Sequence, residues 1–259
     1  METTMYDTLL QLPLFQGLCK DDLTTIIEKV KLHFLNYEEG ETFIRKGEKC
    51  DKFVFLLSGT IKLEAEEPTY KLSETIEEPG VIEPQSMFGI QTIYTANYLT
   101  IAPSKLLTID KSFVLQELMN YEIFRLNYLN ILSSRIQMAN QKLWNARIGT
   151  MREKFISFIQ ARCQKPRGEK VLRITMKDLA FLTNEPTLKV SQMLNGLQKE
   201  GLIQLSRKEI YIPAFEKPYR HLKKLIEAGE NRPEGLMLSW TLGGFPSPTF
   251  EMLARMYSG

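Results

Sequence analysis

The sequence has few of the residues on which metal centres, disulfide frameworks and hydrolase sites depend. Its three cysteines, Cys19, Cys50 and Cys163, are widely separated and form no CxxC pair. This scatter argues against a structural zinc site or an iron–sulfur cluster and favours a reducing compartment. The two histidines, His33 and His221, form no Ser-His-Asp or HExxH arrangement, and no Gly-rich phosphate loop is present. We therefore expect no catalytic residues and no metal site.

Long apolar runs are also missing. No stretch approaches the ~20 apolar residues that a membrane-spanning helix needs. The N-terminus has no basic flank followed by an apolar run, as a secretion signal would. We expect a cytoplasmic protein with no membrane partner.

Charge is unevenly distributed along the chain. The formal net charge of the 259 residues is only +2, but residues 1–141 contain 13 Lys and Arg against 20 Asp and Glu. The remaining residues contain 20 basic against 11 acidic side chains. Chance variation is one explanation, but the asymmetry favours a polyanionic partner for the C-terminal part.

The most informative stretch runs from Ile174 to Ile212. Thr175 is suited to begin a helix because its hydroxyl can accept from free backbone N–H groups, and Asp178 can reach back to it. Asn184 tolerates left-handed backbone and Pro186 suits the first turn of a helix. Two short alternating runs around a polar turn follow. The stretch therefore predicts a helix-turn-helix with a β-hairpin wing.

The second helix of this pair, which Gly201 is placed to end, has an apolar side and a polar side. Its apolar positions are Val190, Met193, Leu194 and Leu197. Its polar positions are Thr187, Lys189, Gln192 and Asn195. Short polar groups on a helix fit the major groove of DNA, where lysine attracts phosphate and glutamine or asparagine can read an adenine edge. A plain helical hairpin with a solvated face is the alternative.

The first half of the chain predicts two short helices over residues 7–29, followed by strands. From Lys31 the apolar period changes to two. Short runs bounded by Gly, Pro or charged residues then continue as far as Ile109. Strands at this spacing predict an antiparallel barrel or sandwich.

Asp110 is expected to cap a long helical stretch. An apolar stripe along this helix alternates steps of three and four, over Leu129, Leu132, Ile136, Ala139, Leu143 and Ala146. So narrow a stripe needs a partner helix, and a second copy of the chain is the simplest partner. Phe124, Tyr128 and Ile131 form a second apolar side for the chain's own barrel. We predict both contacts; packing on the barrel alone is the alternative.

The order of barrel, long helix and winged helix-turn-helix resembles the catabolite activator and fumarate–nitrate regulator (Crp/Fnr) family of bacterial transcription regulators. The resemblance covers residues 9–213 and is firmest over Glu41–Glu48, Phe53–Thr60 and Leu194–Ile203. It implies an α+β fold with an antiparallel β-roll of the cyclic-nucleotide-binding type, a dimerisation helix and a C-terminal winged helix-turn-helix. It also implies double-stranded DNA, a second copy of the chain and RNA polymerase as partners.

The resemblance also implies roles for residues of the two-helix stretch. Phosphate contacts fall to Thr175, Lys177, Lys189 and the wing residue Lys208. Base contacts fall to Thr187, Leu188 and Gln192. Many family members have an arginine and a glutamate where Thr187 and Leu188 stand. The target site should therefore differ from the prototype's palindrome.

The sensor positions depart from the family pattern. Members that bind a cyclic nucleotide hold its ribose with a Gly-Glu pair, where this chain has Phe88–Ile90. They hold its phosphate with an Arg-Ser/Thr pair, where this chain has Tyr94–Ala96. A buried phosphate without a charge-assisted partner loses several kcal/mol, roughly 2–5. We therefore predict that cAMP is not bound. The candidate pocket for an unidentified small-molecule effector consists of Phe88, Gly89, Ile90, Tyr94 and Thr95.

No cofactor is predicted. The lone Cys19 does not fit the iron–sulfur branch of the family. Haem is an alternative, with His33, Cys50 and Met87 as its possible ligands, although a histidine in an alternating strand is more often a packed or surface residue. An apolar effector, or none, also fits the sequence.

The chain is expected to have four parts. Residues 1–110 form a β-roll sensor with N-terminal helices, 111–147 a dimerisation helix and 148–215 the winged helix-turn-helix. Residues 216–259 form an extension of unassigned role, because the family usually ends near the wing. The leading hypothesis is a homodimeric, sequence-specific DNA-binding transcription regulator. The alternative is an effector-binding or protein-interaction module whose winged part is only a scaffold.

Overall fold

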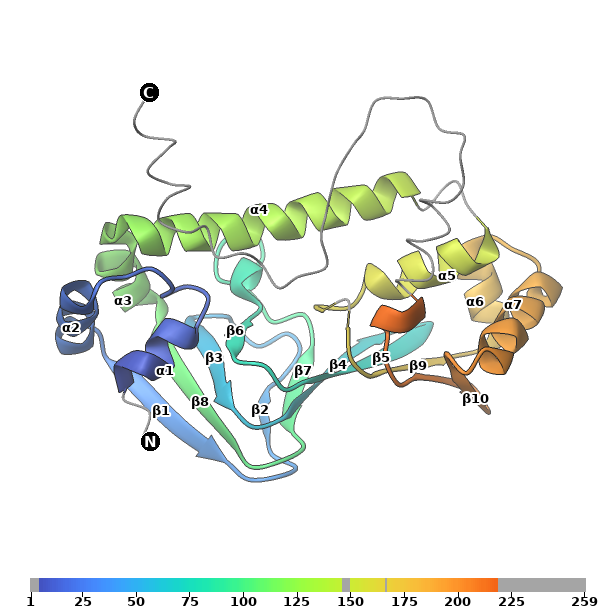
Figure 1. The fold of residues 1–259 in the computed structure, drawn as a ribbon, viewed down its shortest axis with the longest axis horizontal. Coiled ribbons are helices and arrows are strands. Elements are labelled where there is room, and N and C mark those ends of the chain that lie inside the picture. The colour runs from blue at the N-terminus through green and yellow to red at the C-terminus, as the bar shows by residue number, and fades with distance from the viewer. Residues whose placement is uncertain (1–4, 146–149, 166, 219–259) are drawn as a thin grey trace.

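The computed structural model describes residues 5–145, 150–165 and 167–218. The predicted extension over residues 216–259 therefore lies almost entirely outside the described residues, as do Ala146 and His221. Figure 1 shows an elongated molecule with a β-roll at one end and a small helical unit at the other. A long helix runs along one side of the roll toward that unit.

Two short helices precede the roll, as predicted. They are α1 (Met5–Gln11) and α2 (Lys20–Lys29), and Cys19 caps the second by accepting from the backbone N–H of Asp22 at 3.4 Å. Their apolar residues join the main core, where Leu9, Leu12, Phe15 and Leu23 have no exposed surface. The two helices therefore close one end of the roll.

The roll consists of eight strands in two sheets, connected as an antiparallel series. The strands are β1 (Leu32–Tyr37), β2 (Thr42–Ile44), β3 (Lys52–Ser58), β4 (Ile61–Glu67), β5 (Tyr70–Ile76), β6 (Gly80–Ile82), β7 (Asn97–Thr100) and β8 (Ser104–Asp110). The first sheet has the order β1-β8-β3-β6. Phe53 and Phe55 of β3 are fully buried and contact the rings of Tyr128 and Phe15, respectively. The antiparallel pairing of these strands confirms the fold predicted from the alternating pattern.

The second sheet extends beyond the roll. Its order is β10-β11-β9-β5-β4-β7-β2, so three strands of the C-terminal unit continue a sheet of the roll. The connection is antiparallel pairing of β5 with β9 (Lys170–Ile174), in register from Tyr70 opposite Ile174 to Glu74 opposite Lys170. Strand β9 was not predicted from the sequence.

The helical region after the roll differs from the prediction at its start. Asp110 makes no side-chain capping bond and precedes only the short helix α3 (Lys111–Gln116), which is followed by a 3₁₀ turn over Leu118–Asn120. The long helix α4 begins at Glu122 and continues to Asn145. The helical path is interrupted at Tyr121, which has extended backbone, and Leu118 in the preceding turn is fully buried in the core.

The C-terminal unit contains the two helices and the hairpin that the sequence predicts. Helix α5 (Met151–Gln160) has a capping box between Thr150 and Glu153, and it packs on the pair α6 (Met176–Thr183) and α7 (Thr187–Lys199). The hairpin strands are β10 (Gln204–Ser206) and β11 (Glu209–Ile212). The unit has its own buried cluster, separate from the core of the roll. Within the described part of the chain, no helix has the length and apolar character of a membrane span.

Candidate nucleic-acid interface and sensor region

Local features define both ends of α6 and the start of α7. The Thr175 hydroxyl accepts from the backbone N–H of Asp178 at 3.1 Å and donates to its carboxylate at 2.5 Å. Asn184 ends α6 in the left-handed conformation, with φ 52° and ψ 48°. Pro186 directly precedes α7. The Thr175–Asp178 pair, the left-handed backbone at Asn184 and the proline before α7 were each predicted from residue type.

Helix α7 has one buried side and one exposed side. Val190, Leu194 and Leu197 are at most 1% exposed and pack in the cluster that also contains Leu179 of α6. The exposed positions are Thr187, Leu188, Lys189, Gln192 and Asn195. Leu188 has 69% of its surface exposed, and Phe181 of α6 has 80%. The structure thus places every candidate base-reading residue on one solvent-facing surface.

Ion pairs to α5 hold both ends of α7. Glu185 accepts from Lys154 at 2.5 Å and pairs with Lys189 at 3.3 Å, and the bond from Lys154 is the main reason that the pKa of Glu185 is lowered. At the other end, Arg152 makes a bidentate pair with Glu200 at 2.9 Å. These contacts fix the direction in which the exposed face of α7 points.

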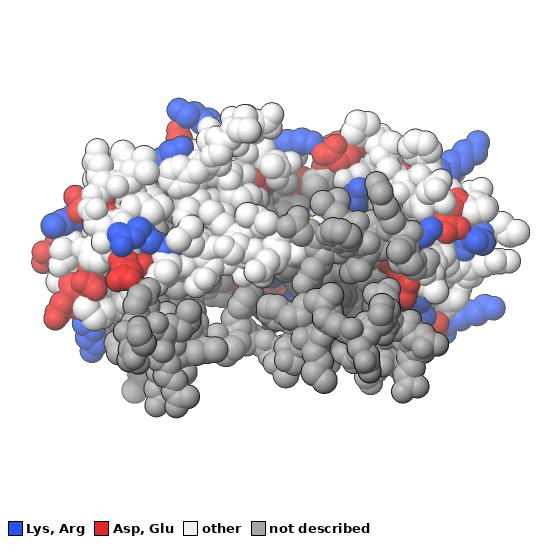
Figure 2. Space-filling view, turned by 90° about the horizontal axis from the view of Figure 1, so that it is seen from above, with Lys and Arg blue, Asp and Glu red and all other residues white. Residues whose placement is uncertain are grey.

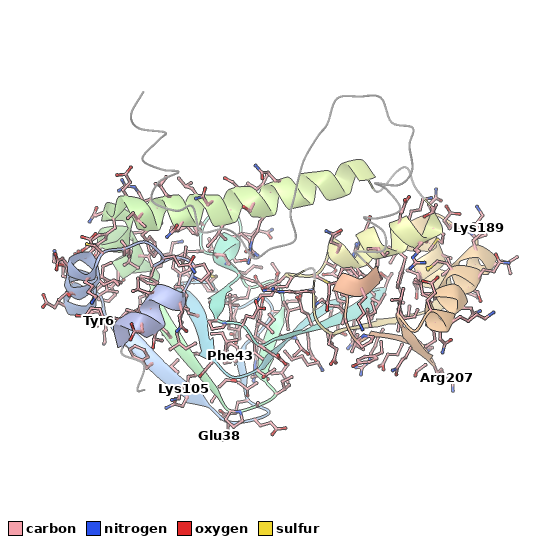
Figure 3. The ribbon with its side chains drawn as sticks, in the orientation of Figure 1. Tyr6, Glu38, Phe43, Lys105, Lys189 and Arg207 are labelled. Carbon is pink, nitrogen blue, oxygen red and sulfur yellow. The ribbon has the colours of Figure 1, made fainter. Side chains whose placement is uncertain are left out.

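The candidate phosphate contacts lie at the same end of the molecule. Lys177 is exposed on α6, and Lys208 is exposed in the hairpin turn with φ 61°. Figure 3 shows Lys189 and Arg207 projecting into solvent from this end. In Figure 2 basic side chains project here, with acidic side chains between them. The predicted polar surface is therefore present, although it is not uniformly basic.

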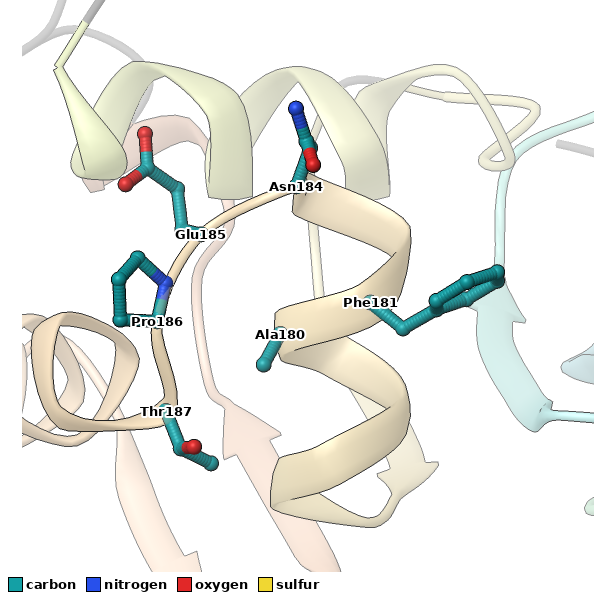
Figure 4. Close-up of a pocket in the computed structure, with 6 residues that line it drawn as sticks. All are labelled: Ala180, Phe181, Asn184, Glu185, Pro186 and Thr187. Atoms are coloured by element: carbon teal, nitrogen blue, oxygen red, sulfur yellow. The ribbon is translucent and has the colours of Figure 1, made fainter.

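Two open pockets flank this surface. A pocket of about 410 Å³ lies at the turn between α6 and α7 and is lined by Ala180, Phe181, Asn184, Glu185, Pro186 and Thr187. Figure 4 shows Phe181 and Thr187 pointing in different directions from it. The second, of about 590 Å³, lies between the β4–β5 hairpin and the wing, and its lining includes Glu66, Glu67, Thr175, Arg207 and Lys208.

The five predicted effector-pocket residues do not point into one cavity. Ile90 is fully exposed, and Gly89 is exposed with φ 108°. Phe88 packs against Tyr128 and under the Lys111 ammonium, 4.7 Å from the ring centre. The buried Tyr94 hydroxyl donates to the carbonyl of Lys52 at 3.2 Å. Of these five residues, only Thr95 donates hydrogen bonds to the buried carboxylate of Glu83.

The carboxylate of Glu83 is buried inside the β-roll. This residue is 1% exposed and has left-handed backbone, with φ 41° and ψ 53°. Its carboxylate accepts from the backbone N–H and hydroxyl of Thr95, both at 2.9 Å, and from Ser86 at 2.8 Å. Tyr98 also donates to it, at 3.0 Å. Burial and the neighbouring Glu83 carboxylate raise the pKa of Tyr98 well above its usual value, so the phenol stays protonated.

The polar network continues into the C-terminal unit. The side-chain amide of Gln164, in the loop after α5, donates to the Tyr98 hydroxyl. Glu74 of β5 and Lys170 of β9 form an ion pair at 3.1 Å, and neither side chain has exposed surface. Arg135 of α4 is beside Tyr98 and Glu83, and burial lowers its pKa. Sequence reasoning missed this network because its members are far apart in the chain.

The stripe predicted as a dimer interface is only partly free. Leu129 and Ile136 have 56% and 60% of their surface exposed, and Ala139 is exposed as well. Leu132 instead packs partly against the core of the roll, and the side chain of Leu143 lies outside the described residues. The opposite side of α4 is buried as predicted, with Phe124 at 0% and Tyr128 at 5% exposure.

The possible haem ligands lie in different surroundings. Met87 is fully buried, Cys50 is 2% exposed, and His33 is half-buried on β1 opposite Thr108. Burial raises the pKa of the Cys50 thiol, which disfavours a thiolate ligand. Among the described residues, no group of three or more His, Cys, Asp or Glu could hold a metal ion.

The β-roll matches a known domain family. Residues 34–121 match the family described as the cyclic nucleotide-binding domain. This match confirms the predicted α+β class with an antiparallel sheet domain of that type.

The chain as a whole is similar to known regulators. It is 23% identical over 189 residues to the global nitrogen regulator of a Nostoc species, covering 68% of this chain and 83% of the relative. It is 22% identical over 197 residues to the global nitrogen regulator of Synechococcus elongatus, covering 71% and 87%. The solved structure of the catabolite activator protein from Thermus thermophilus is 16% identical, with a TM-score of 0.45, over 83% of this chain and 99% of that one. The family match and the similarity to the two nitrogen regulators confirm the resemblance to regulators of the Crp/Fnr family.

Proposed function

We propose that the chain is a transcription regulator that binds duplex DNA as a homodimer through α6, α7 and the wing. The observation that carries this proposal is the exposed face of α7. Gln192 and Asn195 can each pair with an adenine edge, and Leu188 can contact a thymine methyl group. Leu188, with 69% of its surface exposed, is free to make that methyl contact. We assign Thr187 to the same surface.

The candidate phosphate contacts surround this face. Thr175 is the N-cap of α6, and Lys177 follows in its first turn. Lys189 and Lys208 supply positive charge on either side. Side chains in this arrangement fix the register on the duplex without reading sequence. The excess of basic residues after residue 141 supports the same partner.

The exposed stripe of α4 supports dimerisation. Leu129, Ile136 and Ala139 lie on one side of a helix 24 residues long, away from the core of the roll. Two such helices can pack along these positions. A two-fold dimer would carry two copies of α7 and would recognise half-sites about one helical turn, ~34 Å, apart. We include RNA polymerase as a partner only through the family resemblance.

The sensor region is proposed to respond to something other than cAMP. The Glu83 carboxylate already accepts the donors of Thr95 and Tyr98, so a cyclic phosphate entering there would have to displace it. Thermal unfolding with 1 mM cAMP tests this directly. We expect no shift of the Tm, and a rise of several degrees would contradict the proposal.

Selection of bound sequences from a pool of random duplexes tests DNA recognition. We expect enrichment of a palindrome whose sequence differs from that of the catabolite activator. Retention of the pool without any enriched sequence would contradict sequence-specific binding. That result would instead favour a protein-interaction module whose winged unit is a scaffold.

A further inference from the structure

Arg207 lies at the tip of the wing and has no ionic partner there. With Lys208 it forms the turn beyond the last strand pair of the hairpin, Ser206 opposite Glu209. Both side chains of the turn are exposed, and Figure 3 shows Arg207 projecting away from the protein. Within the described part of the chain, the Arg207 guanidinium takes part in no ion pair or hydrogen bond. It is therefore available to a partner outside the chain.

Glutamates around this turn already have cations of their own. The Glu209 carboxylate accepts from the Nε of Arg173 at 2.8 Å. Glu66 and Glu67, which line the same open pocket as Arg207, each pair with a lysine of the roll. Because these carboxylates are engaged elsewhere, the positive charge of Arg207 is left to act on an external anion or on hydrogen-bond acceptors of a partner.

The wing is held in a set position beside α7. Ile203 and Ile210 of the wing are buried in the same apolar cluster as Val190 and Leu194 of α7. Strand β11 also pairs with β9 on its other side, so the hairpin is the edge of a larger sheet and not an isolated two-stranded ribbon. The tip with Arg207 therefore keeps its position relative to the helix face that is proposed to enter the major groove.

The neighbouring residue Lys208 brings this tip to the DNA backbone. Lys208 is proposed above to contact a phosphate, and the phosphates along one side of a major groove also border the adjacent minor groove. That groove is about 6 Å wide in B-form DNA. With Lys208 on the backbone, the long side chain of Arg207 is within reach of the minor groove beside it.

A guanidinium suits a narrow minor groove better than an ammonium does. It is planar, less strongly hydrated and donates in several directions. In the minor groove, A·T pairs present only the acceptors A N3 and T O2, whereas G·C pairs add the guanine N2 amino donor. Runs of A·T pairs also narrow the groove and strengthen its negative potential. An arginine at the tip of the wing therefore favours A·T over G·C pairs.

We propose that Arg207 enters the minor groove flanking the base pairs read by α7 and gives the protein a preference for A·T pairs there. Its role differs from that of Lys208, which contacts phosphate without reading sequence. This inference rests on the proposed DNA-binding function and adds a second determinant of sequence preference, outside the major groove.

The first test changes the minor groove of the DNA separately from its major groove. The base pairs bordering each half-site of the selected duplex are made A·T, G·C or inosine·C. Inosine lacks the guanine N2 amino group, so inosine·C resembles A·T in the minor groove and G·C in the major groove. We expect the wild type to bind A·T and inosine·C flanks equally, and G·C flanks at least about fivefold more weakly. Equal affinity for all three flanks, or inosine·C flanks bound like G·C, would overturn the proposal.

The second test replaces the guanidinium in the full chain, at a position whose exposure leaves the fold undisturbed. We expect Arg207→Ala to bind A·T and G·C flanks alike. Arg207→Lys keeps the charge and should keep the salt slope, but it should lose most of the preference. Lys208→Ala is the matched control in the same turn: affinity should fall equally for every flank, with the A·T preference unchanged. A wild-type preference retained by Arg207→Ala would overturn the proposal.

The two proposals fail in different ways. Selection of a palindrome by the wild type, with equal affinity for all three flanks, would overturn the role of Arg207 and leave the proposed function standing. Absence of sequence-specific binding by the wild type and the Arg207 variants alike would overturn the proposed function, and the role of Arg207 with it.

Discussion

The carboxylate of Glu83 accepts hydrogen bonds from both the backbone N–H and the hydroxyl of Thr95, each at 2.9 Å. Because Glu83 is almost completely buried, each lost donor leaves a charged acceptor less well satisfied. Thr95→Val should therefore lower the free energy of unfolding by about 1–2 kcal/mol. Thr95→Ser keeps the hydroxyl and should remain close to the wild type. Urea unfolding measures both, and equal stability of the valine variant would show that the hydroxyl bond contributes nothing.

A charge placed on the exposed stripe of α4 should separate the dimer. Ile136→Glu puts a carboxylate against its counterpart in the second chain, at a position with 60% of its surface exposed. Sedimentation velocity at micromolar concentration should show monomers. Ile90→Glu makes the same change at a fully exposed position of the roll and should leave the dimer intact. If the Ile136 variant remains dimeric, the interface lies elsewhere.

Two substitutions on α7 should have different effects on DNA binding. Gln192→Ala removes a group that can read a base edge, so discrimination should fall by about 1–3 kcal/mol at one position of the site. Lys189→Ala removes a phosphate contact, so affinity should fall for all sequences and the salt slope should decrease by about 1. Fluorescence anisotropy over a range of salt concentrations distinguishes the two effects.

Lys105→Ala is the matched control for charge, because Lys105 is exposed on the roll far from α7 (Figure 3). It should leave both affinity and salt slope unchanged. A uniform loss of affinity in the Gln192 variant, with its sequence preference retained, would argue against a base contact.

Burial raises the pKa of Tyr128 to about 12, and its hydroxyl donates to the carbonyl of Pro84 at 2.9 Å. An unfolded tyrosine titrates near 10, so the folded protein holds this proton more tightly. The stabilisation is complete below about pH 10 and is lost as pH rises through about 12, at up to roughly 1.4 kcal/mol per pH unit. Unfolding by urea at pH 8 and pH 11 should show a smaller decline for Tyr128→Phe than for the wild type. An identical decline would mean that Tyr128 does not contribute.

The parts of the structure that depend on residues close together in the sequence were predictable. Thr175, Asp178 and Asn184 define the ends of α6 by bonds within a few residues, and the exposed face of α7 follows from the spacing of Val190 and Leu194. The alternation of apolar residues likewise predicted the antiparallel roll.

The parts that depend on distant residues were not predictable. Strand β9 forms because it pairs with β5, and Glu74 and Lys170 are 96 positions apart in the chain. The polar cluster at Glu83 was missed for the same reason. Asp110 was wrongly expected to cap the long helix, because the extended backbone of Tyr121 separates that helix from the short helix after Asp110.

The distance between half-sites tests the central claim most directly, since it depends on two copies of α7 held by one dimer. Affinity should be measured for the selected palindrome and for duplexes with five or ten additional base pairs at its centre. Five base pairs rotate the half-sites to opposite faces of the duplex, because one turn takes about 10–10.5 base pairs. The account predicts at least a tenfold loss of affinity for the five-base-pair insertion, with two chains bound to each unaltered duplex. Affinity that is independent of spacing, or a single chain on each duplex, would contradict it.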